Sequence, residues 1–200
     1  MPFRTPEFDE LENARAAYQA DERRELFYRT ATELVDLAIR NQISLSLAEV
    51  LTVLLQRWNQ PYNRYSRFDA ARRADIERLL SEHRDLLHSI RERAIDDFSE
   101  ADQATVEQLF QDFERILGPV GAARCLHLLA PRFFPLWDRD IASAYLVSLL
   151  EPGGNGERYY RFMRIVKEQC VDLGGEQRIG RNPLQALDEY NYCHHTKRWI

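Results

Sequence analysis

The chain contains 200 residues, of which 44% are hydrophobic, and its formal net charge is −5. This length suits one well-buried core, so we expect a single domain over residues 1–200. No apolar run approaches the ~20 residues of a membrane span, and the acidic balance disfavours a protein that coats nucleic acid nonspecifically. The acidic N-terminus lacks the pattern of a targeting peptide, so we expect a cytoplasmic monomer without membrane contact.

Apolar residues recur with helical spacing along the first half of the chain. Residues 25–41 carry an apolar stripe, and residues 46–58 repeat it after Ser46, which has the spacing of a capping box with Glu49. Residues 66–98 continue the same pattern. Each of these segments is predicted to be helical, and the first two are predicted core helices.

In the second half, helix starts are marked by capping residues and by proline. Ser99 with Asp102 begins one helix, and Asn182 followed by Pro183 begins the last. No segment of alternating β-branched residues competes, so the sequence predicts an all-α fold, a compact helical domain. The helices expected in this half cover residues 106–117, 139–150, 156–172 and 183–195.

Arginine supplies almost all of the positive charge. The only lysines are Lys167 and Lys197, and the stretch from Arg57 to Arg73 contains five arginines against the single acid Asp69. Because arginine suits bidentate contact with phosphate, this stretch is a candidate basic face. The alternative is a plain compositional preference for arginine.

Residues 117–124 combine a tight turn with small side chains, in the order Leu-Gly-Pro-Val-Gly-Ala-Ala-Arg. Such a turn leaves backbone N–H groups at the start of a helix, where the helix dipole also favours an anion. We therefore predict a phosphate grip, with the ordinary end of a helix as the alternative. The predicted contact residues are Gly118, Val120, Gly121, Ala122 and Arg124.

The segments LGPVGAARCLHLLAP (117–131) and FPLWDRDIASAY (134–145) resemble the hairpin and the catalytic segment of the helix-hairpin-helix DNA glycosylase superfamily. The family's aspartate corresponds to Asp138, seventeen positions after Gly121, although Pro135-Leu136-Trp137-Asp138 is one residue longer than the family's pattern. The resemblance implies a helical glycosylase that binds double-stranded DNA with a flipped-out base and hydrolyses its N-glycosidic bond.

The chemistry of base excision agrees with an aspartate at this position. Breaking the N-glycosidic bond builds positive charge on the sugar, so a carboxylate beside the anomeric carbon stabilises the transition state and orients or deprotonates water. Asp138 is the candidate for this catalytic role, and Asp140 is the alternative. Asp138 is also a candidate N-cap of the following helix, and the two roles are compatible.

Members of the superfamily that also cut the strand use a lysine amine as the nucleophile. This chain has Ala122, Ala123 and Arg124 at the corresponding positions, and arginine stays protonated. The resemblance therefore implies a monofunctional enzyme, without lyase activity, that leaves an abasic site. The family's four-cysteine iron–sulfur loop is missing, and the three cysteines are widely spaced, so we expect reduced thiols, no metal and no cofactor.

A flipped base needs a pocket of aromatic and hydrogen-bonding groups. Residues 54–68 and the C-terminal residues 187–199 are both rich in such groups. Ordinary aromatic packing is the alternative for both segments, and a satisfied core histidine is the alternative for His127. The predicted pocket residues are Trp58, Asn59, Tyr62, Arg64, His127, Trp137, Tyr190 and Asn191.

These features together predict a DNA glycosylase that acts on a damaged or modified base, in DNA repair or in defence against modified viral DNA. Two other hypotheses fit the same residues. In one, the hairpin binds DNA and Asp138 is only a helix cap. In the other, the aromatic segments bind a partner protein and DNA plays no part.

Overall fold

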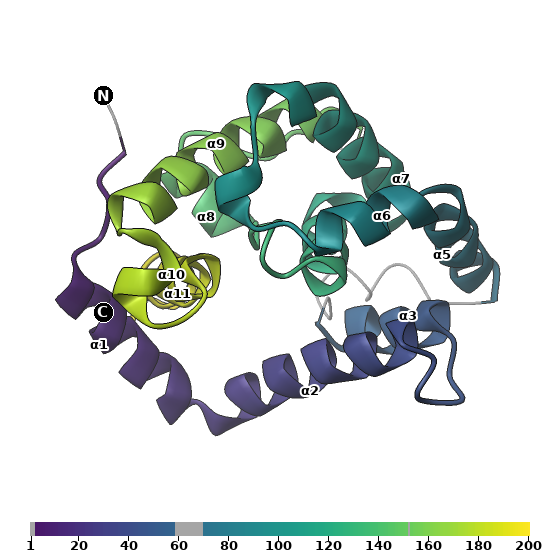
Figure 1. The fold of residues 1–200 in the computed structure, drawn as a ribbon, viewed down its shortest axis with the longest axis horizontal. Helices are drawn as coiled ribbons and strands as arrows, with labels where there is room; N and C mark the ends of the chain where they lie inside the picture. Colours follow the sequence, from purple (N-terminus) through teal and green to yellow (C-terminus); the bar gives the residue numbers. More distant parts are fainter. Residues whose placement is uncertain (1–2, 59–69, 152) are drawn as a thin grey trace.

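The computed structural model describes residues 3–58, 70–151 and 153–200, which form helices and connecting segments without any β-strand (Figure 1). The predicted all-α fold is confirmed. The α-helices are α1 (Phe8–Ala20), α2 (Glu22–Ile39), α3 (Leu47–Trp58), α5 (Ala70–Glu82), α6 (Arg84–Arg91), α7 (Gln103–Leu129), α8 (Arg139–Ala144), α9 (Gly156–Asp172), α10 (Gly175–Ile179) and α11 (Pro183–Asn191). Two short turns, η1 (Ile95–Asp97) and η2 (Glu100–Asp102), precede α7, and the π-helix η3 (Tyr192–Lys197) follows α11.

Side-chain caps form at two of the predicted helix starts. The backbone N–H of Ser46 donates to the Glu49 carboxylate at 2.8 Å, and the backbone N–H of Glu49 donates to the Ser46 hydroxyl at 3.2 Å. The side chain of Asn182 accepts a hydrogen bond from the N–H of Leu184, with Pro183 as the first residue of α11. These caps satisfy N–H groups that have no partner inside the helix. Both predicted starts are confirmed.

The predicted helical segment 66–98 is divided in its described part. α5 ends at Glu82, and α6 runs from Arg84 to Arg91. Between them His83 has φ −106° and ψ 14°, and its Nε2 lies 3.2 Å from Oδ2 of Asp112 on α7. This contact holds the chain against α7 at the point where the helix direction changes.

The predicted helix 139–150 is wrong beyond Ala144. The Tyr145 hydroxyl is buried. It lies within hydrogen-bond distance of two acceptors, the side-chain oxygens of Gln169 and Asn191, each 2.9 Å away. The next residue, Leu146, has φ 54°, which no helix accommodates. Anchoring Tyr145 in the core therefore takes the chain out of the helix.

Helix α7 consists of two helices that meet at Gly118. This glycine has φ 70° and ψ 169°, a conformation that is essentially restricted to glycine. Pro119 opens the second half, where the missing proline N–H would have had no helical partner. The predicted change of helix at the glycine turn is therefore found at Gly118, with no separate loop between the two halves.

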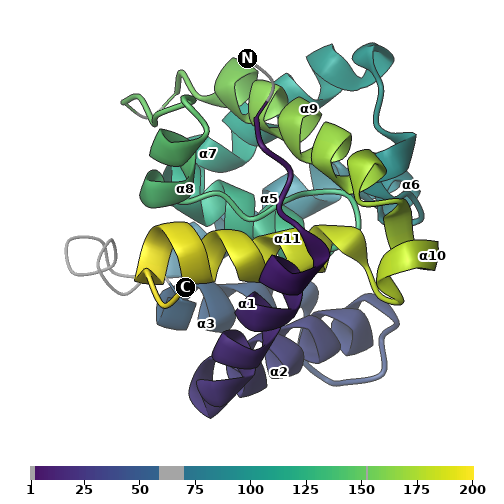
Figure 2. The same cartoon turned by 90° about the vertical axis from the view of Figure 1, so that its left-hand side faces the viewer.

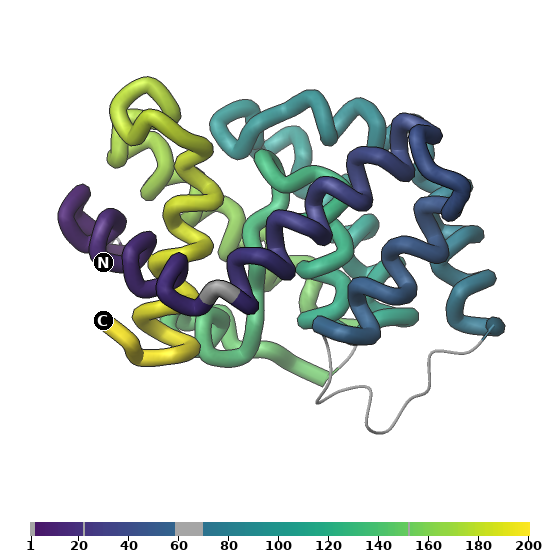
Figure 3. The backbone as a smooth tube through the Cα atoms, turned by 90° about the horizontal axis from the view of Figure 1, so that it is seen from below, coloured from purple at the N-terminus to yellow at the C-terminus, as the bar shows by residue number. Residues whose placement is uncertain are grey.

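The first helix of the chain packs against the last ones. α1 contacts α11 and η3, and these elements lie on the same side of the molecule (Figures 2 and 3). Elsewhere α7 packs against α9, and α3 packs against α2 and α5. Buried apolar residues from Leu11 to Cys193 form one continuous cluster. Within the three described ranges, no helix combines the length and apolar character needed to cross a membrane.

Candidate functional site

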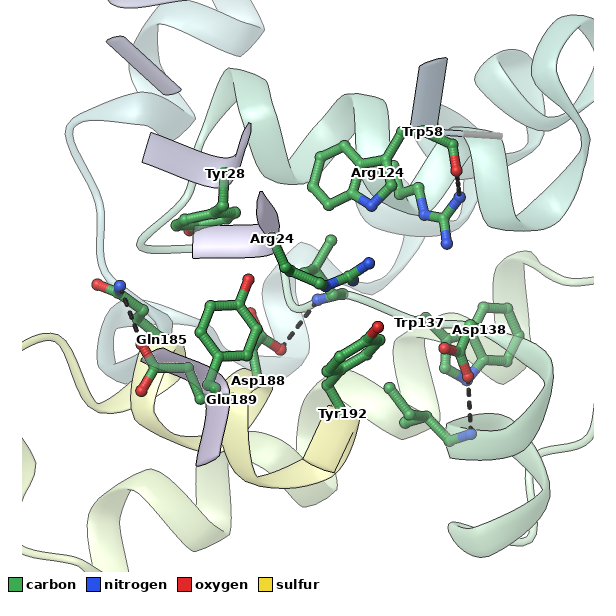
Figure 4. Close-up of a pocket in the computed structure, with 13 residues that line it drawn as sticks. Arg24, Tyr28, Trp58, Arg124, Trp137, Asp138, Gln185, Asp188, Glu189 and Tyr192 are labelled. Carbon is green, nitrogen blue, oxygen red and sulfur yellow. Dashed lines mark hydrogen bonds between the residues drawn. The ribbon is translucent and has the colours of Figure 1, made fainter. Parts of the chain in front are cut away.

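A narrow pocket lies where helices from the beginning, middle and end of the chain meet (Figure 4). α1, α2 and α3 form one side of it, and α7, α8 with the loop before it, α11 and η3 form the rest. The described residues that line it are Tyr18, Arg24, Tyr28, Trp58, Arg124, Leu136, Trp137, Asp138, Ile141, Gln185, Asp188, Glu189 and Tyr192.

Asp138 caps α8 and is half-buried at one end of this pocket, beside Trp137 (Figure 4). Its Oδ1 accepts hydrogen bonds from the N–H groups of Asp140 at 3.0 Å and Ile141 at 2.9 Å. Its Oδ2 accepts one from the Thr196 hydroxyl at 2.9 Å. The predicted cap is confirmed. A carboxylate has about four acceptor sites, so a fixed acceptor site remains for water or a ligand.

Two arginines line the pocket near Asp138. Arg124, on the second half of α7, donates to the carbonyl oxygen of Trp58 at 2.7 Å and lies 5.3 Å from the centre of its ring. Arg24 stacks over the Tyr192 ring at 3.7 Å. Burial and repulsion by Arg24 lower the pKa of Arg124 to about 10, which still leaves it charged at neutral pH. Neighbouring guanidinium groups favour an anion such as phosphate.

Polar atoms without hydrogen-bond partners gather around this pocket. Among the described residues, seven buried side-chain nitrogen and oxygen atoms lack a partner, and four of them belong to pocket-lining residues. Buried polar atoms are nearly always paired in native proteins, so this concentration indicates a site for a polar ligand. The four atoms are Arg24 Nε, Trp58 Nε1, Trp137 Nε1 and Asp188 Oδ2.

The pocket is small. Its cavity volume is about 30 Å³, which is enough room for a water molecule. A nucleobase is several times larger, so its entry requires side chains to move apart. The Arg24–Tyr192 stack is the pair best suited to this, because Arg24 is half-exposed on a long side chain. Changes of side-chain rotamer are common when ligands bind.

Asp188 and Glu189 on α11 provide two acids at the end of the pocket away from Asp138 (Figure 4). Asp188 is only 6% exposed, and its Oδ1 accepts a hydrogen bond from the N–H of Leu136 at 3.1 Å. Burial raises the pKa of Asp188 well above its ordinary value, which favours the neutral acid. Burial also raises the pKa of Glu189, but the Arg181 guanidinium, 2.6 Å from its Oε2, opposes this effect.

His127 lies directly behind the pocket, completely buried. Its Nδ1 is 2.7 Å from the carbonyl oxygen of Phe134, and its Nε2 is 2.7 Å from the Tyr28 hydroxyl. Since a carbonyl only accepts, Nδ1 carries the proton and Nε2 accepts from Tyr28. Asp188 Oδ2 is 3.6 Å from Nδ1, but burial favours the neutral form of both groups, which disfavours an ion pair here. His127 therefore positions Tyr28.

His127 is expected to stay neutral until the pH falls to about 4. Burial lowers its pKa from 6.5 to about 4, against a smaller opposing effect of the Phe134 carbonyl. The unfolded chain takes up this proton near pH 6.5, whereas the folded chain takes it up only near pH 4. As the pH falls from 6.5 to 4, His127 alone therefore reduces the free energy of unfolding by about 3 kcal/mol. Long-range proton–nitrogen NMR spectra of the imidazole report both the titration and the Nδ1–H tautomer. A midpoint near 6.5 would contradict the burial seen here.

The structure brings four of the predicted site residues together at the pocket: Trp58, Arg124, Trp137 and Asp138. Asp140, the alternative catalytic residue, is exposed and does not line it. The other predicted residues fall into three groups. The first group is buried but does not line the pocket: Tyr190, Asn191 and His127. The second belongs to α7 and does not line it either: Gly118, Val120, Gly121 and Ala122. The third lies outside the described residues: Asn59, Tyr62 and Arg64.

Of the predicted phosphate contacts, only Val120 and Arg124 are half-exposed. Gly118, Gly121 and Ala122 are buried.

Tyr190 stacks on His194 with ring centres 5.2 Å apart, and Asn191 accepts from the Tyr145 hydroxyl. Both side chains therefore have partners outside the pocket.

Two pocket residues carried no signal in the sequence. Arg24 and Tyr28 look like ordinary members of an amphipathic helix, because nothing near them in the chain distinguishes them. Asp188 and Tyr192 belong to the aromatic C-terminal segment 187–199, but the residues selected from it were Tyr190 and Asn191. The available hint for Asp188 was its spacing of four residues from Leu184, which places the two on one side of the helix.

No known protein-family model matches the chain, and neither a curated protein nor a solved structure matches it. The chemistry of the pocket is therefore inferred from its own residues.

Proposed function

We propose that the protein is a monofunctional DNA glycosylase that removes a damaged or modified base from double-stranded DNA. The observation that carries this proposal is the position of Asp138, which lines a pocket with aromatic walls and two arginines. Base excision needs these three kinds of group. A carboxylate acts on the sugar, aromatic rings hold the base, and cations hold the phosphate.

In the proposed complex, the flipped base lies between Trp58 and Tyr192 after Arg24 has left its stack on Tyr192. The phosphate of the flipped nucleotide binds Arg124. The remaining acceptor site of Asp138 binds the attacking water, and its charge stabilises the positive charge that develops on the sugar. Water adds to the anomeric carbon as its bond to the base breaks, and the products are the free base and an abasic site.

The proposed reaction stops at the abasic site. No lysine is found among the pocket-lining residues that the structure describes. Lys167 donates to the carbonyl oxygen of Phe98, and the Lys197 amine lies 5.7 Å from the centre of the Tyr192 ring. Strand cleavage without alkali would contradict the monofunctional proposal, and Lys197 would be the first amine to replace.

The proposal is tested with end-labelled duplexes that each carry one modified base. After incubation with the protein, alkali cuts the strand at any abasic site. We expect alkali-dependent cleavage at the modified position of at least one duplex, and none in the unmodified duplex. Duplex binding without cleavage in any member of the panel would favour a DNA-binding module instead, and absence of duplex binding would exclude both functions.

A further inference from the structure

Asp188 carries a hydrogen-bonding group that nothing in the folded chain uses. Its Oδ1 accepts from the N–H of Leu136, whereas its Oδ2 is buried and has no partner. Burial raises the pKa of Asp188, which favours the protonated acid. Because Oδ1 accepts from Leu136, the unpartnered Oδ2 is the oxygen available to carry that proton. A buried donor without an acceptor is unfavourable. A ligand atom that accepts this hydrogen bond removes the deficit.

Tyr28 offers the complementary group in the same pocket. Its hydroxyl proton is directed to Nε2 of His127, so its oxygen remains able to accept a hydrogen bond. Asp188 and Tyr28 thus present one donor and one acceptor. This pair suits the edge of a nucleobase on which a carbonyl oxygen or ring nitrogen stands next to an N–H group.

Charge in the pocket disfavours a cationic base. Arg24 and Arg124 line it as cations, burial favours the neutral form of Asp188, and Glu189 is already paired with Arg181 at 2.6 Å. Among the lining residues within the described ranges, the remaining carboxylate is Asp138, at the opposite end of the pocket (Figure 4). A positively charged base near Asp188 is therefore repelled by the two arginines, and it has no unpaired carboxylate beside it.

We infer that the pocket takes a neutral nucleobase, bound through a hydrogen bond from the Asp188 carboxyl group to an acceptor on the base, and rejects cationic alkylated bases. Asp188 is then the residue that determines specificity. This inference rests on the proposed function, which it narrows to neutral substrates such as the deaminated bases uracil and hypoxanthine.

The first test compares substrates of the wild-type protein and needs no variant. Matched duplexes contain uracil, hypoxanthine or a cationic methylated guanine at one position, with spontaneous depurination subtracted. We expect release of a neutral base and at least a tenfold lower kcat/KM for the methylated guanine. Its binding leaves the buried Asp188 carboxyl group unpaired, and the positive charges of Arg24 and Arg124 repel it. Preferential release of the cationic base overturns the inference.

The second test replaces the donor. Asp188→Leu is expected to lower kcat/KM for the neutral base by about tenfold to a hundredfold, whereas Asp188→Asn retains activity because its amide N–H group donates in place of the carboxyl proton. Asn191→Leu is the matched control, since Asn191 is buried on the same helix, also carries an unpartnered atom and does not line the pocket. An active Asp188→Leu protein, or a folded but inactive Asp188→Asn protein, overturns the role of Asp188.

A third measurement separates this inference from the proposed function. Trp58 and Trp137 line the pocket, so binding of free hypoxanthine is followed by tryptophan fluorescence without any reaction on DNA. Binding that Asp188→Leu abolishes supports the inference even if no duplex is cleaved, in which case the glycosylase proposal alone fails. Base release that is insensitive to Asp188 leaves the glycosylase proposal intact and overturns the inference. Absence of both binding and release overturns both.

Discussion

Base release by the Asp138→Asn variant is expected to fall by about a hundredfold to ten-thousandfold, the usual range for loss of a general base. Asparagine carries no negative charge to stabilise the sugar cation, and it cannot take a proton from water. It does accept hydrogen bonds at an N-cap as well as aspartate does. The bonds from Asp140 and Ile141 that hold α8 are therefore retained, and so is the affinity for duplex DNA. Single-turnover release rates and a separate binding titration measure the two effects.

Asp140→Asn is the matched control for this variant. Asp140 is two residues away, carries the same charge and belongs to the same helix, but it is exposed and does not line the pocket. Its base release is expected to equal that of the wild-type protein. Full activity of Asp138→Asn would mean that Asp138 is only the cap of α8, and a loss confined to Asp140→Asn would assign the reaction to the other carboxylate.

The helices that could be predicted are those whose signals are local. Ser46 and Glu49, or Asn182 and Pro183, lie close together in the chain, and their hydrogen-bonding and steric preferences act over a few residues. α1 was not predicted, because its apolar face is short and its burial depends on α11, at the other end of the chain. The early end of α8 depends in the same way on the distant partners of Tyr145.

The candidate site was predictable only in part, for the same reason. Trp58, Trp137 and Asp138 stood out by residue type, and Arg124 by its place after the glycine turn. Asp188 became notable only through burial, which α2, α7 and α11 produce together. Successive helical residues point in directions about 100° apart, so Asp188 lines the pocket whereas Tyr190 and Asn191, from the same aromatic segment, lie elsewhere. The composition of residues 187–199 indicated that this segment is a candidate for the pocket, but only the packed structure shows which of its side chains line it.

Gly118→Ala is expected to destabilise the protein by about 1–3 kcal/mol, because alanine must adopt a backbone conformation that is essentially restricted to glycine. Gly118 has φ 70° and ψ 169° where the two halves of α7 meet. The corresponding loss in Tm is about 5 °C for a chain of this size. Because Arg124 follows on the second half of α7, relaxation of the turn also moves its guanidinium relative to Asp138, and base release is expected to fall by more than the loss of folded protein explains.

Gly154→Ala provides the control for this substitution. Gly154 has no positive φ, and an added Cβ there meets the nearest atom, in the Leu150 side chain, at an ordinary 3.5 Å. Its effect on stability is expected to stay within about 0.5 kcal/mol. Urea unfolding of both variants and the wild-type protein measures the difference. Equal stability of Gly118→Ala and Gly154→Ala would mean that the bend in α7 does not require glycine, and the link between this turn and the position of Arg124 would then be lost.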